Sequence, residues 1–187
     1  MRNRILMAAF EEMNVRGVKF TMSDLAKRLN VSKTSLYEHF SSKSELVQNI
    51  LITVIQDIQE QEEAIYNNSE LTFAEKIPTL LKVAPTVFGP INNYRLQDDL
   101  QLYYPKEFRI VEKFKEERQE RFLFLIVQGI ENNAIRPINT KVLRQLIVST
   151  TNDLFSYHFL SASNMTAPDA LAAMSDIIVN GLLPRKA

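Results

Sequence analysis

Apolar side chains recur every three or four residues along most of the chain, and short polar or proline-containing segments interrupt the pattern. This spacing places the apolar side chains on one face of an α-helix. We therefore expect an all-α protein. The predicted helices cover residues 3–15, 21–29, 33–40, 43–66, 72–83, 92–104, 106–133, 140–162 and 167–183.

Helix-start signals are densest in residues 21–46. Thr21 with Asp24, and Ser42 with Glu45, have the spacing of capping boxes. In a capping box, a hydroxyl and an acid three residues later bond the free backbone N–H groups at a helix start. The signals lie so close together that the helices between them must be short.

Two short amphipathic helices joined by a tight turn at residues 30–32 are the pattern of a helix-turn-helix. Ser32 can cap the second helix, on which Leu36 and Phe40 share an inward face. The other sides of that helix carry polar side chains, namely Lys33, Thr34, Ser35, Tyr37, Glu38 and His39. Hydroxyls and donors at the exposed start of a helix suit a reader of the DNA major groove.

Two interpretations of this motif stay open on spacing alone. In the first it binds DNA, and Lys43, in the first turn of the next helix, reaches a phosphate beside that helix's N-terminus. In the second the motif is only structural, within a helical module that binds a small molecule or another protein. The residue types favour DNA binding.

A denser pattern resembles the N-terminal domain of TetR-family transcriptional regulators. It covers about the first 47 residues and consists of Ile5-Leu6, Ala8-Ala9, Gly17, Thr21-Met22, Asp24-Leu25-Ala26, the run from Val31 to Tyr37, His39-Phe40, Ser42-Lys43 and Leu46. The rest of the chain resembles the family in helix count and order. The resemblance implies a homodimer whose paired N-terminal domains bind a palindromic operator, with a larger C-terminal domain for ligand binding and dimerisation.

The resemblance also implies roles for individual residues. Thr21, Tyr37, His39 and Lys43 would hold the phosphate backbone, whereas Ser32, Lys33, Thr34 and Ser35 would lie at or near base edges. Tyr37 could instead pack against the protein, and His39 could cap or pack.

The chain departs from the family pattern at several positions. Glu12 stands where a leucine is usual, and Thr34 replaces a frequent small residue or proline. Glu38 places a negative charge near the groove, where it could accept from a cytosine amino group or simply face solvent. Of the basic arm that some members carry before the first helix, only Arg2 and Arg4 are available.

The charge of the chain is unevenly distributed although its formal net charge is zero. Residues 1–47 carry eight Lys and Arg against five Asp and Glu, so the remainder is equally negative. A weakly basic head on an acidic body suits a small DNA-binding domain attached to a second domain. We predict a helix-turn-helix domain at residues 1–47 and a ligand-binding and dimerisation domain at residues 48–187.

Aromatic side chains and isolated polar groups in the second predicted domain permit a cavity for a small-molecule effector. For any single residue, packing in the core is the competing interpretation. The predicted lining residues are Tyr103, Phe114, Phe122, Ile126, Asn152 and Phe155. The chemical class of the effector is not readable from them.

The last predicted helix, residues 167–183, contains no Lys or Arg and carries a continuous apolar stripe. Such a helix needs a partner surface, either within the chain or on a second copy. With the preceding helix it could form a two-fold, four-helix interface. The predicted interface residues are Leu154, His158, Leu171, Met174 and Ile178.

Catalytic and metal-binding patterns are missing from the sequence. The chain has no cysteine, two histidines far apart and four scattered glycines, so we expect no catalytic residue, cofactor or metal. No apolar run is long enough to span a bilayer, and Glu11 and Glu12 follow the first apolar run without a cleavage signal. We therefore predict a cytoplasmic, ligand-responsive transcriptional regulator, most simply a repressor, and not an enzyme.

Overall fold

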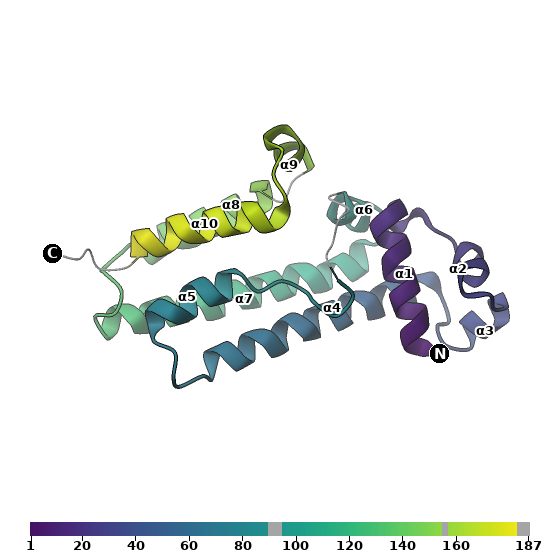
Figure 1. Cartoon of the computed structure of the whole chain (residues 1–187), viewed down its shortest axis with the longest axis horizontal. Helices are drawn as coiled ribbons and strands as arrows, with labels where there is room; N and C mark the ends of the chain where they lie inside the picture. The colour runs from purple at the N-terminus through teal and green to yellow at the C-terminus, as the bar shows by residue number, and fades with distance from the viewer. Residues whose placement is uncertain (90–94, 155–156, 183–187) are drawn as a thin grey trace. The chain divides into compact units, whose positions relative to one another are not determined.

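The computed structural model describes residues 1–89, 95–154 and 157–182, and within these ranges the secondary structure is entirely helical (Figure 1). The predicted all-α fold, with an N-terminal helix-turn-helix followed by a larger helical part, is confirmed. The helices are α1 (Arg2–Arg16), the 3₁₀ turn η1 (Gly17–Lys19), α2 (Met22–Leu29), α3 (Lys33–Tyr37), α4 (Lys43–Tyr66), α5 (Phe73–Leu81), α6 (Leu96–Tyr103), α7 (Pro105–Glu131), α8 (Thr140–Leu154), α9 (Tyr157–Ser163) and α10 (Ala167–Leu182).

The helix predicted over residues 140–162 falls on α8 and α9, and residues 155–156 between them lie outside the described residues. The helix predicted over residues 33–40 ends at Tyr37, and the chain turns at the next two residues. This turn still carries Phe40 into the core, where none of its side chain is exposed.

The described residues form two compact units. Unit 1 contains Met1–Ile58 and Pro85–Phe114, and unit 2 contains Gln59–Ala84 and Lys115–Ala187. Unit 1 therefore combines the helix-turn-helix with α6 and the first part of α7. The predicted functional boundary between residues 47 and 48 stays a prediction, because packing units and functional domains need not coincide.

The core of unit 1 holds the helix-turn-helix rigidly. Ile5 and Ala9 of α1, Leu25 of α2, Leu36 of α3 and Leu46 of α4 have none of their surface exposed. α6 contributes further buried leucines to the same cluster. Because each short helix is anchored by a fully buried side chain, the positions of its polar residues are fixed by the core.

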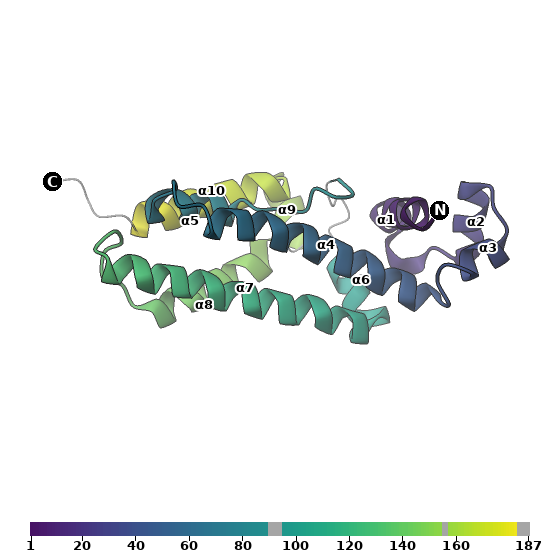
Figure 2. The ribbon, with the colours of Figure 1, turned by 90° about the horizontal axis from the view of Figure 1, so that it is seen from below.

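Unit 2 has its own apolar core between α5, α7, α8 and α10. α10 packs against α5 and α8, as can be followed for α5 in Figure 2. The buried members are Ile77, Leu80, Phe122, Leu125, Ile126, Ile135, Leu143 and Leu182. None of the described helices is both long enough and apolar enough to cross a membrane.

An ion pair between α4 and α7 lies inside unit 2. The segment 59–63 is polar all round, yet Glu62 is only 4% exposed. Its carboxylate accepts a hydrogen bond from Nε of Arg118. Nη2 of Arg118 also donates to the backbone carbonyls of Leu80 and Val83, at 3.3 Å each. Arg118 therefore joins α4, the end of α5 and α7.

Candidate nucleic-acid interface

The start of α2 is fixed by the predicted capping box. The backbone N–H of Asp24 donates to Thr21 Oγ1 at 3.1 Å, while the N–H and hydroxyl of Thr21 donate to Asp24 Oδ2 at 2.9 and 2.7 Å. The hydroxyl and then the backbone N–H of Thr21 lower the pKa of the Asp24 carboxyl below its ordinary value of 3.8. The hydroxyl that would contact a phosphate is thus oriented by Asp24.

We expect the substitution Asp24→Asn to have a pH-dependent effect on stability. The folded-state pKa of Asp24 lies below its unfolded value, so the carboxylate stabilises the fold above pH about 4. This contribution is lost as the pH falls through the lower, folded-state pKa. Urea midpoints measured from pH 7 down to pH 2 should therefore converge for wild type and Asp24→Asn. The exposed control Glu60→Gln should show no comparable convergence; a pH-independent gap for Asp24→Asn would contradict the assignment.

The turn between α2 and α3 is closed by Asn30 in the left-handed conformation, with φ of 54°. Its N–H donates to the carbonyl of Lys27 at 3.2 Å, and the N–H of Val31 donates to that of Ala26 at 3.0 Å. These bonds satisfy the carbonyls at the end of α2, as a Schellman-type cap does. The turn therefore holds α3 at a defined angle to α2.

α3 presents the polar residues that the sequence predicted. Ser32 caps the helix by accepting from the N–H of Ser35 at 3.0 Å. Leu36 is fully buried, whereas Tyr37 on the adjoining side is 48% exposed. The exposed residues at and beside this helix are Ser32, Lys33, Thr34, Tyr37 and Glu38, and Ser35 and His39 are half-buried.

The start of α4 is capped differently from the prediction. The N–H of Glu45 donates to Ser42 Oγ at 3.1 Å, which is one half of the predicted capping box. The carboxylate of Glu45 instead accepts from the N–H and hydroxyl of Ser41, at 2.7 and 2.6 Å. The predicted reciprocal bond between Ser42 and Glu45 is therefore wrong in its second half.

Lys43 is directed into the protein. Its ammonium donates to the backbone carbonyl of Val18 and lies 4.4 Å from the ring centroid of Phe20. Burial lowers the pKa of this lysine. A phosphate contact by Lys43 would require the ammonium to leave the Val18 carbonyl.

Two further arginine contacts complete the helix-turn-helix. Arg28 donates to Glu12 Oε1 at 2.8 Å, and Glu12 is only 6% exposed, so this pair fastens α2 to α1. The sequence analysis noted Glu12 only because the family usually has a leucine there. Its position on the apolar face of α1 was the sequence signal that its carboxylate would be buried and paired with a cation. Arg2 lies over the ring of Phe40, 4.9 Å from its centroid, and bonds Asn49.

The predicted effector-site residues that the structure describes are divided between the two units. Phe122 and Ile126 belong to the apolar core of unit 2. In unit 1, Phe114 is buried, while Tyr103 is 50% exposed with Nζ of Lys19 5.6 Å from its ring centroid. The remaining two predictions, Asn152 and Phe155, fall outside the residues whose side chains the structure describes.

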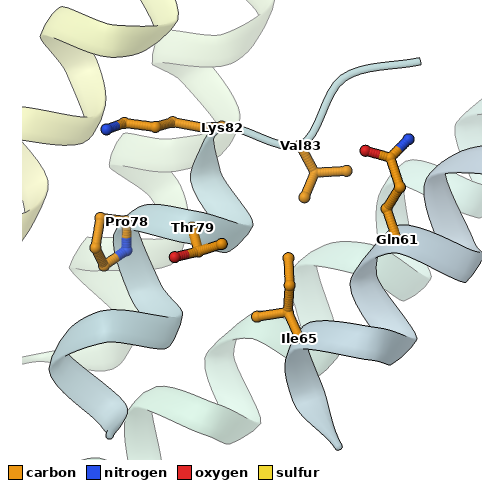
Figure 3. A pocket seen from close by; sticks show the side chains of 6 residues that line it. All are labelled: Gln61, Ile65, Pro78, Thr79, Lys82 and Val83. Carbon is orange, nitrogen blue, oxygen red and sulfur yellow. The ribbon is translucent and has the colours of Figure 1, made fainter. Parts of the chain in front are cut away.

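Unit 2 has a hollow of about 380 Å³ that sequence reasoning missed. It opens between α4 and the end of α5 (Figure 3), and its lining residues are Gln61, Ile65, Pro78, Thr79, Lys82 and Val83. Three of these are apolar and three can form hydrogen bonds. Pro78 inside α5 is the one sequence signal for the site, because a proline within a helix removes a backbone bond and makes the helix irregular.

The predicted dimer residues are divided between the interior and partly exposed positions. Met174 is buried at 7% exposure, and Ile178 packs on the core of unit 2. Leu154 and Leu171 are half-buried, and the side chain of His158 lies outside the described set. The most exposed apolar side chains of α8 and α10 are Val142 (55%), Leu146 (58%) and Ile177 (72%).

Comparison with known proteins agrees with this architecture. Residues 5–50 match the family model described as bacterial regulatory proteins, tetR family. The chain is 28% identical over 182 residues to an uncharacterized HTH-type transcriptional regulator, YvaF, of Bacillus subtilis (strain 168), covering 97% of this chain and 95% of that protein.

Solved structures share the fold over nearly the whole chain. A transcriptional regulator from Saccharomonospora viridis, in complex with choline, has a TM-score of 0.81 at 16% identity and 98% coverage of both chains. AibR, in complex with isovaleryl coenzyme A and operator DNA, has a TM-score of 0.65 at 17% identity and full coverage of both chains. The N-terminal residues of the chain thus match the tetR family of bacterial regulatory proteins, and nearly its whole length has the fold of solved regulators of this kind.

Proposed function

We propose that this protein is a ligand-responsive repressor that binds a palindromic operator as a homodimer in the cytoplasm. The observation that carries the proposal is the construction of α3: Lys33, Thr34 and Tyr37 are exposed, while Leu36 beside them is fully buried. A core-anchored helix with exposed donors can enter the major groove without changing the packing beneath it.

The polar residues of the head divide into two proposed roles. Lys33, Thr34 and Ser35 lie in the first turn of α3, where they can reach base edges from the groove, with Ser32 beside them as the cap. Thr21, Tyr37 and His39 would contact the phosphate backbone, which sets the register of the head on the duplex. Glu38 is exposed next to these residues and would discourage contact with a phosphate.

The proposed DNA contacts predict a specific response to salt. Lys33→Ala should weaken binding to a palindrome from the protein's own promoter region and lower the slope of log affinity against log salt, because it removes one cation from the surface that faces the DNA. The control Lys141→Ala, at an exposed lysine of α8, should leave the slope unchanged. Equilibrium titration at several salt concentrations measures both. Absent or salt-insensitive binding by wild type would contradict the DNA-binding proposal.

For the homodimer we propose the exposed apolar side chains Val142, Leu146 and Ile177 as the core of the interface. They lie on α8 and α10, two helices that pack against each other in unit 2. Leu154 and Leu171, which are half-buried, could lie at its margin. An apolar face of this kind is typical of a surface covered by a partner subunit.

A small-molecule effector is supported by the relatives rather than by a bound ligand. One structural neighbour binds choline and another binds isovaleryl coenzyme A. The hollow between α4 and α5 is within the size range of ligand sites, and its three apolar and three hydrogen-bonding lining residues suit an amphipathic molecule. Release of the operator on addition of choline or isovaleryl coenzyme A would identify a shared effector, and a reporter gene behind the operator would distinguish a repressor from an activator.

A further inference from the structure

Unit 1 buries a charged side chain on its first helix. Glu12 is only 6% exposed and lies on the same face of α1 as Ile5, Ala8 and Ala9, which are all buried. Removing a carboxylate from water is costly, and the cost is offset only where its oxygens are well bonded. The contacts of this carboxylate therefore decide whether it contributes to stability.

The carboxylate of Glu12 is incompletely bonded. Nη1 of Arg28 donates to its Oε1 at 2.8 Å, but the Arg28 side chain is 41% exposed, so water weakens the attraction. Among the residues that the structure describes, none forms a hydrogen bond with Oε2, although Nε of Arg16 lies 3.5 Å from it. Apolar side chains in place of a buried charge pair are often as stable or more stable. Stability alone therefore does not account for this pair.

Arg28 bonds two consecutive residues of α1 at once. Besides its bond to Glu12, it donates from Nη2 to the carboxylate of Glu11. The donors of a guanidinium are fixed in one plane, so a fork that spans two carboxylates is satisfied over a narrow range of orientations. An apolar contact is non-directional and would allow α2 to roll on α1. The fork therefore fixes the orientation of α2 as well as its contact with α1.

The orientation of α2 determines where the proposed DNA contacts lie. Arg28 is in the last turn of α2, two residues before Asn30, which closes the turn into α3. Thr21, a proposed phosphate contact, caps the opposite end of the helix. Since α3 packs directly on α2, a roll of α2 on α1 would move Thr21 and the DNA-reading helix together.

We propose that Glu12 and Arg28 are positioning residues: the fork orients α2 on α1 and so sets the operator affinity, without contact to DNA and without a gain in stability. This inference rests on the proposed DNA-binding function. It separates two properties that a purely structural ion pair would change together, namely the melting temperature and the operator affinity.

The test replaces the pair by apolar side chains in the full-length protein, as Glu12→Leu/Arg28→Met. This double variant removes one charge of each sign, so the net charge that DNA meets is unchanged. We expect its melting temperature, followed by circular dichroism, to equal or exceed that of wild type. Operator affinity should fall about tenfold, as for a tenfold lower population of the binding orientation. The slope of log affinity against log salt should equal that of wild type, because no phosphate contact is lost.

Arg28→Lys is a second variant, which keeps both charges of the pair. An ammonium is a point charge without the fixed donor directions of a guanidinium, so it cannot replace the fork. Operator affinity should again fall, at an unchanged salt slope. The control Glu63→Leu/Arg121→Met removes an exposed ion pair of unit 2, whose side chains are 53% and 42% exposed, and should bind the operator like wild type.

Three results would overturn the inference. Wild-type affinity in both variants of the pair would show that the DNA-binding orientation does not depend on the fork. A lowered salt slope in Glu12→Leu/Arg28→Met would make Arg28 a phosphate contact. A lower melting temperature in that double variant, with Arg28→Lys binding like wild type, would make the pair a stabilising contact only.

Hydrogen exchange tests the fork without DNA. If wild type binds no operator, the proposed function fails, but the orienting role of the fork can still be measured. Amide exchange in α2 should then be faster in Glu12→Leu/Arg28→Met than in wild type, because the helix is held less firmly. Unchanged exchange in α2 would contradict the orienting role.

Discussion

Replacing Arg118 with methionine should destabilise the protein by about 3 kcal/mol, the lower end of the cost of breaking a buried ion pair, because the Arg118 side chain is 31% exposed while that of Glu62 is buried. The carboxylate of Glu62 would remain buried without its cation, since Glu62 is only 4% exposed. The carbonyls of Leu80 and Val83 would lose the donor that now lies 3.3 Å from each. Urea denaturation followed by circular dichroism measures the loss, provided that the slope of the transition is unchanged.

The chain offers a matched control one helical turn away. Arg121 pairs with Glu63, but both side chains are about half exposed, at 42% and 53%. Arg121→Met should therefore cost about 1 kcal/mol or less. The double variant Glu62→Leu/Arg118→Met should recover most of the loss, because it leaves no buried charge. Equal losses for Arg118→Met and Arg121→Met would show that burial of the first pair has no energetic consequence.

Replacing Ile177 with aspartate should convert the proposed dimer into a monomer. Ile177 is 72% exposed in the single chain, so the substitution should leave the fold intact while placing a charge in the proposed interface. A monomer would bind each half-site separately, without the high effective concentration that a dimer gives its second helix-turn-helix. Operator affinity should therefore fall about 100-fold or more. Sedimentation equilibrium at micromolar concentration and operator titration measure the two effects.

Val15→Asp is the control for this experiment. Val15 is equally exposed, at 75%, but it lies on α1 and outside the proposed interface. It should leave the oligomeric state unchanged. A wild-type monomer at micromolar concentration would contradict the two-fold mechanism, and a dimeric Ile177→Asp would place the interface elsewhere.

Local signals in the sequence predicted most helix boundaries well. The capping pair of Thr21 with Asp24 is present in the structure, as is the cap of α3 by Ser32. These features involve side chains and backbone groups within three residues of one another. Spacing alone is therefore enough to identify them.

Contacts between distant segments could not be predicted in this way. Lys43 bonds a carbonyl 25 residues away, and Glu62 pairs with an arginine 56 residues away. Neither contact has a signal in the local sequence, because exposed positions are the ordinary location of charged side chains. Glu12 was noticed only because it stands where the family usually has a leucine.

Helical periodicity also could not distinguish the two apolar faces of α10. The predicted stripe contains Met174 and Ile178, and the structure uses these residues to cover the core of unit 2. Ile177, adjacent in sequence but a quarter turn away, is the exposed one. A stripe shows that a helix has a buried face, but the neighbour that buries it depends on the tertiary fold.

Footprinting on the DNA upstream of the protein's own gene tests the central proposal most directly. A homodimer that presents two copies of α3 should protect a two-fold symmetric site whose half-sites are separated by about one helical turn or a multiple of it. Protection should weaken steeply with added salt. An asymmetric footprint, or no protection at low salt, would contradict the proposal that α3 reads a palindromic operator.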